Sequence, residues 1–431
     1  MKILHLSALD GQTGAGIAAA RIHEGLRASG VESRFCVAYP SIGVEGAFTP
    51  KATLLDRADR LTRCAIDNWL VRRYSPGYSS TGIGGLSIRK LVARERPDIL
   101  QLHWIGGNTF RLGSLSGIQV PVVWRLPDMW PFCGVEHYEP DPQRYVRAPR
   151  LGISLSPPFF DVSEFFRYRK LAVYQTIQDL RVVCPSRWTI SEVKRSALLG
   201  SRDVSHIPTS CDTTLFSLKD RSACRKSLNI PLDKVIVLVG ATSMGTNWKG
   251  LDLFISAMAQ LGKNPGVKRT ADIHVLSFGK DPFRASELNG FVSVEHLGLV
   301  KDRRLMSILY SAADVFVAPS RMENLSNAVL ESLSCGTPVV AFDIGGMPDM
   351  IEHKNNGFLA LPFDSSQLAN GIQWAIDRRG DEEIRQAARN KILKNFSLKS
   401  EIDQYIDLYT DCLRRPIGIN APAREAVIHG D

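Results

Sequence analysis

The chain contains no apolar run approaching the roughly 20 residues that a membrane-spanning helix needs. Its eight cysteines are scattered, with no Cys-x-x-Cys pair and no histidine at metal-ligand spacing. Its first residues, MKILHLSALDG, lack the long apolar core of a signal peptide. These features argue against a transmembrane protein, a zinc-binding fold and a disulfide scaffold. We therefore expect reduced thiols and a cytoplasmic location.

Positive charge is concentrated in the first half of the chain. Residues 1–200 hold 26 Lys and Arg against 17 Asp and Glu, whereas residues 201–431 hold 27 against 27. We expect the first half to face an anionic partner, such as phospholipid or a pyrophosphate-linked acceptor. Chance drift of surface charge is the alternative. We expect no nucleic-acid partner.

Short apolar segments alternate with amphipathic ones throughout the 431 residues, a length that suggests two domains. Strands are predicted over residues 2–8, 35–40, 98–104, 120–128, 180–186, 234–241, 273–280, 292–300, 313–320 and 339–342. Helices are predicted over residues 17–29, 51–74, 163–180 and 383–414. This alternation predicts an α/β fold with two doubly wound parallel sheets.

A Pro- and Thr-rich segment, residues 207–216, is the predicted interdomain linker. We expect an N-terminal Rossmann-like domain over residues 1–212 and a C-terminal one over residues 213–398. A helix over residues 399–415 is expected to pack back on the N-terminal domain. Residues 416–431 are expected to form an irregular tail.

Two carboxylates, Glu323 and Glu331, lie within the most informative stretch, residues 319–357. Between them a loop is predicted to enter a helix, with Ser326 as a good N-cap residue and Gly336 at the helix end. A helix N-terminus at the carboxyl end of a parallel strand is an anion site. The arrangement suits a ligand with an anionic middle and hydroxyl-rich ends.

A nucleotide sugar is such a ligand. Glu323 is expected to accept hydrogen bonds from donor-sugar hydroxyls, and Glu331 from both ribose hydroxyls. A solvated helix with two surface carboxylates is the alternative. The diphosphate is expected to lie on the backbone amides around Asn324, Leu325, Ser326 and Asn327.

Gly14 and Gly16 belong to a G-x-G-x-x-A pattern between a predicted strand and a predicted helix. The pattern alone suggests a dinucleotide site. The acidic residue usual at the end of the second strand is missing, because that strand ends Val37-Ala38-Tyr39-Pro40. Small residues here let amides reach a phosphate or sugar, and a tight turn needed only for packing is the alternative.

The segment PSRMENLSNAVLESLSCGTPVVAFDIGGMPDMIEHKNNG closely resembles the core motif of the retaining glycosyltransferases of family 4. HWIGGNTF at 103–110 and WRLPDMWPFCGVEHY at 124–138 resemble a subgroup carrying a HDMWPFTGGCHY-like segment, as in bacterial exopolysaccharide and lipopolysaccharide synthesis. CPSRW at 184–188 also matches the family. The resemblance implies a GT-B fold, with two facing Rossmann-like domains, a cleft between them and the nucleotide sugar on the C-terminal side.

The resemblance also assigns roles to single residues. It implies that Lys249 contacts the donor diphosphate, where a point charge would stabilise the departing nucleotide. The family's second basic residue is missing near Ala241, and Arg321 is the substitute candidate. The usual histidine is replaced by Pro127, which has no side-chain donor or acceptor. We name Asp128, beside it, as catalytic together with Glu323 and Lys249.

Family membership implies transfer of a sugar, with retention, from a nucleotide diphosphate sugar to a glycan or lipid-linked acceptor. The sequence contains no Asp-x-Asp, so we expect no metal and no cofactor. Helix dipole and Lys249 would stabilise the diphosphate instead. Two alternatives stay open, a nucleotide-sugar epimerase on the same architecture and a non-catalytic protein that binds sugar nucleotides.

A basic amphipathic helix is predicted over residues 54–74. Its apolar stripe consists of Leu54, Ala58, Leu61, Ala65 and Trp69, and Arg57, Arg60, Arg63, Arg72 and Arg73 lie around it. Such a helix can lie on an anionic membrane, which predicts peripheral attachment at the inner membrane face. A surface helix packed on its own domain is the alternative.

Overall fold

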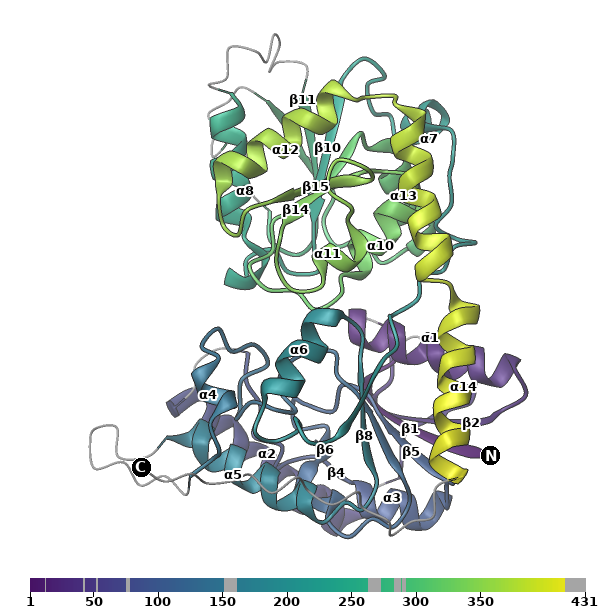
Figure 1. Ribbon diagram of the computed structural model, residues 1–431, viewed down its shortest axis with the longest axis vertical. Coiled ribbons are helices and arrows are strands. Elements are labelled where there is room, and N and C mark those ends of the chain that lie inside the picture. The colour runs from purple at the N-terminus through teal and green to yellow at the C-terminus, as the bar shows by residue number, and fades with distance from the viewer. Residues whose placement is uncertain are drawn as a thin grey trace. The chain divides into compact units, whose positions relative to one another are not determined.

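The computed structural model divides the chain into two compact units (Figure 1). Unit 1 comprises Met1–Ile207 and the chain from Ile402 onward, and unit 2 comprises Pro208–Glu401. The described residues are 1–11, 13–41, 43–51, 53–74, 78–150, 161–262, 273–282, 288 and 292–414. The tail predicted over 416–431 lies outside them.

Unit 1 is built on a seven-stranded sheet of order β3-β2-β1-β5-β7-β8-β9, in which every pair is parallel. The strands are β1 (Lys2–Leu9), β2 (Glu32–Tyr39), β3 (Ala47–Phe48), β5 (Ile99–Leu102), β7 (Val122–Arg125), β8 (Leu180–Cys184) and β9 (Asp203–His206). The pair β4 (Leu86–Ser87) and β6 (Phe110–Arg111) is separate. The helices are α1 (Gly14–Ala28), α2 (Leu54–Tyr74), α3 (Ile88–Glu95), η1 (Leu112–Leu115), α4 (Gln143–Val146), α5 (Val162–Gln175) and α6 (Arg187–Arg195).

Unit 2 has a six-stranded parallel sheet of order β12-β11-β10-β13-β14-β15. The strands are β10 (Val235–Gly240), β11 (Ile273–Phe278), β12 (Ser293–His296), β13 (Val315–Ala318), β14 (Val339–Phe342) and β15 (Gly357–Ala360). The helices are α7 (Arg221–Ser227), η2 (Asn247–Lys249), α8 (Leu251–Leu261), α9 (Arg303–Ala312), α10 (Asn327–Ser334), α11 (Met347–Met350), α12 (Ser365–Asp377) and α13 (Glu382–Asn395).

Helices cover both faces of the unit 2 sheet (Figure 1). On one face, Phe254 of α8 and Ile372 of α12 share a core with Val237 of the sheet. On the other, Leu309 of α9 and Val329 of α10 pack with Leu238. Burial on both faces explains the nearly continuous apolar strands. The predicted fold class, two doubly wound parallel sheets, is confirmed.

The helix predicted to start at residue 17 begins at Gly14. Thr13 caps it by accepting a hydrogen bond from the Gly16 amide at 3.2 Å. A Cβ on Gly16 would lie 3.0 Å from the Leu9 carbonyl oxygen, so the glycine lets the first turn approach the end of β1. The boundary was wrong because a glycine-rich first turn was interpreted as loop.

The last helix, α14 (Leu398–Arg414), starts in unit 2 and continues into unit 1. The Tyr409 hydroxyl donates to the Gln101 side-chain oxygen at 2.9 Å. The Arg181 guanidinium donates to Asp411 at 2.5 Å. These contacts attach the C-terminal part of α14 to β5 and β8 of unit 1.

The apolar stripe of α2 points to solvent, while the helix packs on its own domain through its opposite side, where Leu70 contacts the unit 1 core. Attachment to a membrane therefore stays a prediction. Leu54, Leu61 and Trp69 are 82%, 71% and 60% exposed. The opposite side carries Asp67, which is 2% exposed and accepts the Thr81 amide at 2.8 Å. Among the described residues, no helix has the length and hydropathy needed to cross a bilayer.

Candidate functional site

The loop after β13 leads into the N-terminus of α10. Ser326 is the N-cap residue, with extended backbone and no side-chain cap hydrogen bond. Its carbonyl accepts the Leu330 amide at 3.1 Å, which starts the helix. The amides of the first turn have no partner within the helix, and its dipole is positive there. Such a helix start can bind an anion, and contact of a diphosphate with Asn324, Leu325, Ser326 and Asn327 stays a prediction.

Lys249 and Glu323 meet beside this N-terminus. Lys249 ends η2, and its Nζ lies 2.6 Å from Oε2 of Glu323 across 74 residues of sequence. Their side chains are 31% and 12% exposed, so the pair is partly shielded but open to a ligand. The structure thus brings together two of the three predicted catalytic residues.

Two glycines fix the backbone on either side of Glu323. Gly250, just after Lys249, has φ of 64°, and a Cβ there would lie 2.0 Å from the Pro319 oxygen. Gly345 has φ of 52°, and its Cβ would lie 1.9 Å from the Glu323 oxygen. The Gly346 amide donates to that same oxygen at 3.2 Å. Only glycine permits approaches this close. The two glycines therefore let the backbone after η2 and the backbone before α11 pack against the loop that carries Glu323.

Arg321, the substitute candidate for the missing basic residue, anchors η2. Its guanidinium binds the Asp252 carboxylate with both terminal nitrogens, at 2.7 and 2.5 Å, and donates to the Asn247 oxygen at 3.0 Å. The hydrogen bond from Arg321 lowers the pKa of Asp252. This geometry makes Arg321 a positioning residue for η2, and direct contact with a donor stays a prediction.

Another basic residue, not anticipated from the sequence, lies beside Ala241. Lys280 follows β11 and is exposed, and its amide donates to the Thr242 oxygen at 3.1 Å. The next residue, Asp281, orders the same loop by accepting from the Ser243 hydroxyl at 2.7 Å and the Gly245 amide at 2.9 Å. The signal was available, since Lys280 is the last residue of a predicted parallel strand, at the carboxyl end where ligands bind.

Glu331 lies on α10 with Arg303 of α9 nearby. Nη2 of Arg303 is 4.0 Å from Glu331 Oε1, and its guanidinium covers the Phe216 ring at 5.3 Å. Burial, with a smaller contribution from Glu331, raises the pKa of the neighbouring Tyr310 hydroxyl. The Glu331 side chain is 13% exposed, which suits a carboxylate that accepts ligand hydroxyls. No sequence pattern linked Arg303 to Glu331.

Asp128, in unit 1, lies in a buried polar network. Its Oδ2 accepts from Trp104 Nε1 at 2.8 Å and lies 2.6 Å from His137 Nδ1, while Oδ1 accepts the Trp130 amide at 3.1 Å. His137 Nε2 lies 2.7 Å from the Ser80 hydroxyl. Asp128 is 5% exposed, so these contacts indicate a positioning role, and a catalytic role for Asp128 stays a prediction.

Gly14 and Gly16 occupy the first turn of α1, at the carboxyl end of β1. The structure supports the packing explanation for Gly16, whose Cβ position is closed by backbone atoms of Leu9 and Gly11. Ligand contact by these glycines stays a prediction. Among the described residues, no group of three His, Cys, Asp or Glu is arranged to hold a metal ion.

Residues 233–378 match the model of a family described as Glycosyl transferases group 1. Over 220 residues the chain is 29% identical to a D-inositol 3-phosphate glycosyltransferase of Geodermatophilus obscurus. This alignment covers 47% of this chain and 46% of that protein. The chain thus spans about half the length of this curated relative. These matches support the glycosyltransferase group 1 family.

Solved structures match over nearly the whole chain. HepE of Anabaena, in complex with UDP-glucose, superposes with a TM-score of 0.65 at 19% identity, over 95% of this chain and 100% of that one. WaaG, a glycosyltransferase involved in lipopolysaccharide biosynthesis, gives 0.61 at 15% identity, over 95% and 99%. At these identities the likeness shows the fold, which is of the GT-B glycosyltransferase type.

Proposed function

We propose that the chain is a retaining glycosyltransferase that moves a sugar from a nucleotide diphosphate sugar to a glycan or lipid-linked acceptor in bacterial cell-surface polysaccharide synthesis. The observation that carries the proposal is the Lys249–Glu323 pair, 2.6 Å apart beside the N-terminus of α10. It places a cation, a carboxylate and a helix dipole at one point, and the family match covers all three.

The residues of unit 2 divide the work of binding the donor. The diphosphate lies on the first-turn amides of α10, and Lys249 neutralises the charge that grows as the nucleotide departs. Glu323 accepts hydrogen bonds from hydroxyls of the transferred sugar, and Glu331 accepts hydrogen bonds from the ribose hydroxyls. Because Lys249 and Glu323 already hold each other, the donor finds both groups oriented before it binds.

No base is assigned to the transfer step. Asp128 is committed to Trp104, Trp130 and His137, and Pro127 carries no proton acceptor on its side chain. The donor's own diphosphate oxygen is therefore proposed to take the acceptor proton, on the face from which the nucleotide leaves. That route delivers the acceptor to the same face and accounts for retention.

The acceptor is proposed to be lipid-linked, with the enzyme attached peripherally at the cytoplasmic membrane face. Support comes from α2, whose exposed Leu61 and Trp69 lie on the same surface as Arg57 and Arg72. An apolar stripe flanked by arginines fits an anionic bilayer.

The decisive experiment incubates the full chain with radiolabelled UDP-, GDP- and ADP-sugars, with and without a membrane extract as acceptor source. We expect the chain to bind one of these donors, to hydrolyse it slowly without acceptor, and to transfer the label to a larger product when the extract is present. Interconversion of a UDP-sugar alone would identify an epimerase, and binding without hydrolysis or transfer would identify a non-catalytic protein.

A matched pair of variants ties the activity to the site. Lys249→Gln removes the cation beside Glu323, and Lys226→Gln removes one from the exposed surface of α7. Transfer should fall in the first and persist in the second. Equal transfer in both variants would contradict the assignment.

A further inference from the structure

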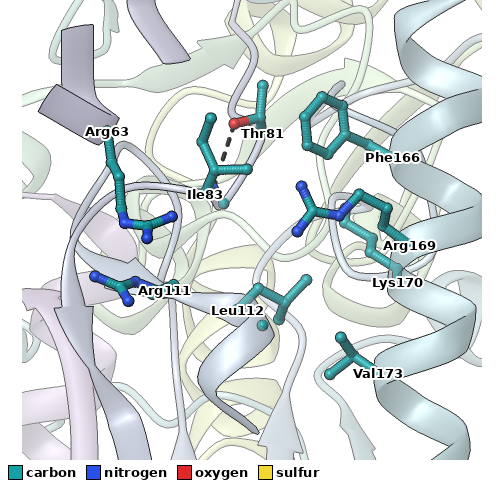
Figure 2. A pocket seen from close by; sticks show the side chains of 11 residues that line it. Arg63, Thr81, Ile83, Arg111, Leu112, Phe166, Arg169, Lys170 and Val173 are labelled. Carbon is teal, nitrogen blue, oxygen red and sulfur yellow. Dashed lines mark hydrogen bonds between the residues drawn. The ribbon is translucent and has the colours of Figure 1, made fainter. Parts of the chain in front are cut away.

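Unit 1 contains a basic cavity of about 60 Å³ that includes none of the residues assigned to the donor (Figure 2). That is several times the roughly 10–15 Å³ needed for one water molecule. Four of its lining residues are basic and none is acidic. The basic residues are Arg63, Arg111, Arg169 and Lys170, and an apolar wall is formed by Ile83, Leu112, Phe166 and Val173.

Arg63 and Arg111 share a single carboxylate. Nε of Arg63 lies 2.7 Å from Asp59 Oδ1, and Nη2 of Arg111 pairs with Oδ2. The hydrogen bonds from Arg63 and Arg111 lower the pKa of Asp59. Two guanidinium groups held by one anion leave a net positive charge, which a second anion would neutralise. Figure 2 shows both groups on the same side of the cavity.

Arg169 reaches toward them from α5 on the opposite side (Figure 2). Its guanidinium lies 5.9 Å from the ring centres of Phe165 and Phe166. Within the described part of the chain, no carboxylate forms an ion pair with Arg169. Nε of Arg111 is buried and has no hydrogen-bond partner there. The cavity therefore has donors that the protein itself leaves unused.

Lys170 lines the cavity from α5, next to Arg169. Its ammonium donates to the Cys133 oxygen at 3.1 Å and also to the Trp130 oxygen, and it lies 4.0 Å from the Trp130 ring centre. Burial lowers its pKa to about 7. An anion in the cavity would stabilise the charged form of this side chain.

We propose that this cavity binds a phosphoryl group, held by the guanidinium groups of Arg63, Arg111 and Arg169, with an apolar part of the same ligand against Phe166. Guanidinium groups match phosphate oxygens in shape and charge, and groups converging from two sides suit an anion with several acceptor oxygens. The site is separate from the donor site and independent of it. Its ligand is a lipid headgroup or a soluble phosphate ester.

The test titrates the full chain with inorganic phosphate and with glycerol 1-phosphate in a calorimeter. Arg169→Gln should weaken binding about tenfold or more, because charge-assisted hydrogen bonds to the anion are lost. Lys194→Gln is the matched control, since it removes one charge from an exposed position on α6 of the same unit. Lys249→Gln, in the donor site, should retain the binding component that Arg169→Gln loses.

Unchanged phosphate affinity in Arg169→Gln, or an equal loss in Lys194→Gln, would overturn the proposal. A loss in Lys249→Gln alone would place the phosphate in the donor site and also overturn it. Arg63→Gln, on α2, should also weaken phosphate binding, so the test does not depend on the folding of a single variant.

A vesicle assay distinguishes the two sources of the phosphoryl group. Phosphatidylcholine vesicles with and without phosphatidic acid are sedimented with wild type and Arg169→Gln. A headgroup ligand requires that Arg169→Gln lose the increment due to phosphatidic acid. If only the soluble esters respond to the substitution, the ligand is a soluble phosphate ester, and the phosphoryl site stands.

Discussion

Lys249 and Glu323 lie 74 residues apart in sequence and 2.6 Å apart in the structure. The sequence elements that bring them together are the tight turn at Gly250 and the close approach of Gly345 to the Glu323 carbonyl. In the proposed function this pair holds a cation where a nucleotide diphosphate meets the dipole of α10, and the roles of the cation and of the carboxylates on that helix can be tested separately.

Lys249→Gln should weaken nucleotide diphosphate binding by roughly ten- to a hundredfold, since a charge-assisted hydrogen bond contributes about 1.5–3 kcal/mol. The loss should be much smaller for the nucleoside alone, which lacks the diphosphate. Titration calorimetry with the diphosphate and the nucleoside measures both, with Lys226→Gln as the charge control. A similar loss for both ligands would place Lys249 elsewhere.

Glu331→Ala should weaken nucleotide binding roughly ten- to a hundredfold through the loss of hydrogen bonds to ribose. The sharper measurement compares ribo- with 2′-deoxyribonucleotide. Wild type should prefer the ribonucleotide, and Glu331→Ala should bind the two nearly equally. If folded Glu331→Ala still prefers the ribonucleotide as strongly as wild type, Glu331 does not bind the ribose.

Donor binding is predicted to be independent of divalent metal, because a helix dipole and Lys249 stand at the proposed diphosphate position. Nucleotide is titrated with EDTA and, separately, with added magnesium. Affinities within a factor of about two are expected, which corresponds to roughly 0.4 kcal/mol. A strong loss of nucleotide affinity on addition of EDTA would show that a bound metal ion contributes to donor binding.

The parallel sheets were predictable because their strands are buried on both faces and therefore read as continuous apolar segments. The placement of Glu323 in the loop before α10 and of Glu331 on that helix was predictable because both lie within one short motif. Arg303 was not, because its approach to Glu331 depends on how α9 packs beside α10. The buried position of Asp128 also escaped prediction, since its partners Trp104 and His137 come from separate loops.

Acid should destabilise unit 1 through three buried histidines. Burial lowers the pKa of His5, His23 and His103. Nδ1 of His5 lies 3.0 Å from Nε2 of His103. Their folded pKa values lie below the unfolded value of 6.5, so the unfolded chain binds protons that the folded chain does not. Their contribution is complete above pH 6.5 and is lost as pH falls from there.

Urea unfolding of unit 1, followed by tryptophan fluorescence, measures this effect at pH 7.5 and at lower pH. Each such histidine contributes up to about 1.4 kcal/mol per pH unit in its window. His23→Asn should reduce the slope, whereas the exposed His353→Asn in unit 2 should not. A stability that is flat between pH 7 and 5 would show that protons enter this cluster without cost.

The outward face of α2 should attach the chain to anionic vesicles. Two of its arginines are already engaged within the protein, since Arg60 donates to the Tyr39 hydroxyl of β2 at 2.9 Å and Arg63 to Asp59 of the same helix at 2.7 Å. The sharper test therefore uses Arg57 and Arg72, which are exposed. An arginine near an anionic bilayer contributes about 1 kcal/mol, so each Arg→Gln should weaken binding about fivefold at low salt.

The apolar contribution separates insertion from simple charge attraction. Leu61→Ser with Trp69→Ser removes side chains that are 71% and 60% exposed, so folding should tolerate the change. Binding that remains at high salt, where charges are screened beyond a few ångströms, should disappear in this variant. Leu393→Ser, at a 44% exposed position in unit 2, is the control. Wild type that stays in the supernatant at low salt would make α2 an ordinary surface helix. Equal sedimentation of wild type and the double variant would move the contact to another part of the chain.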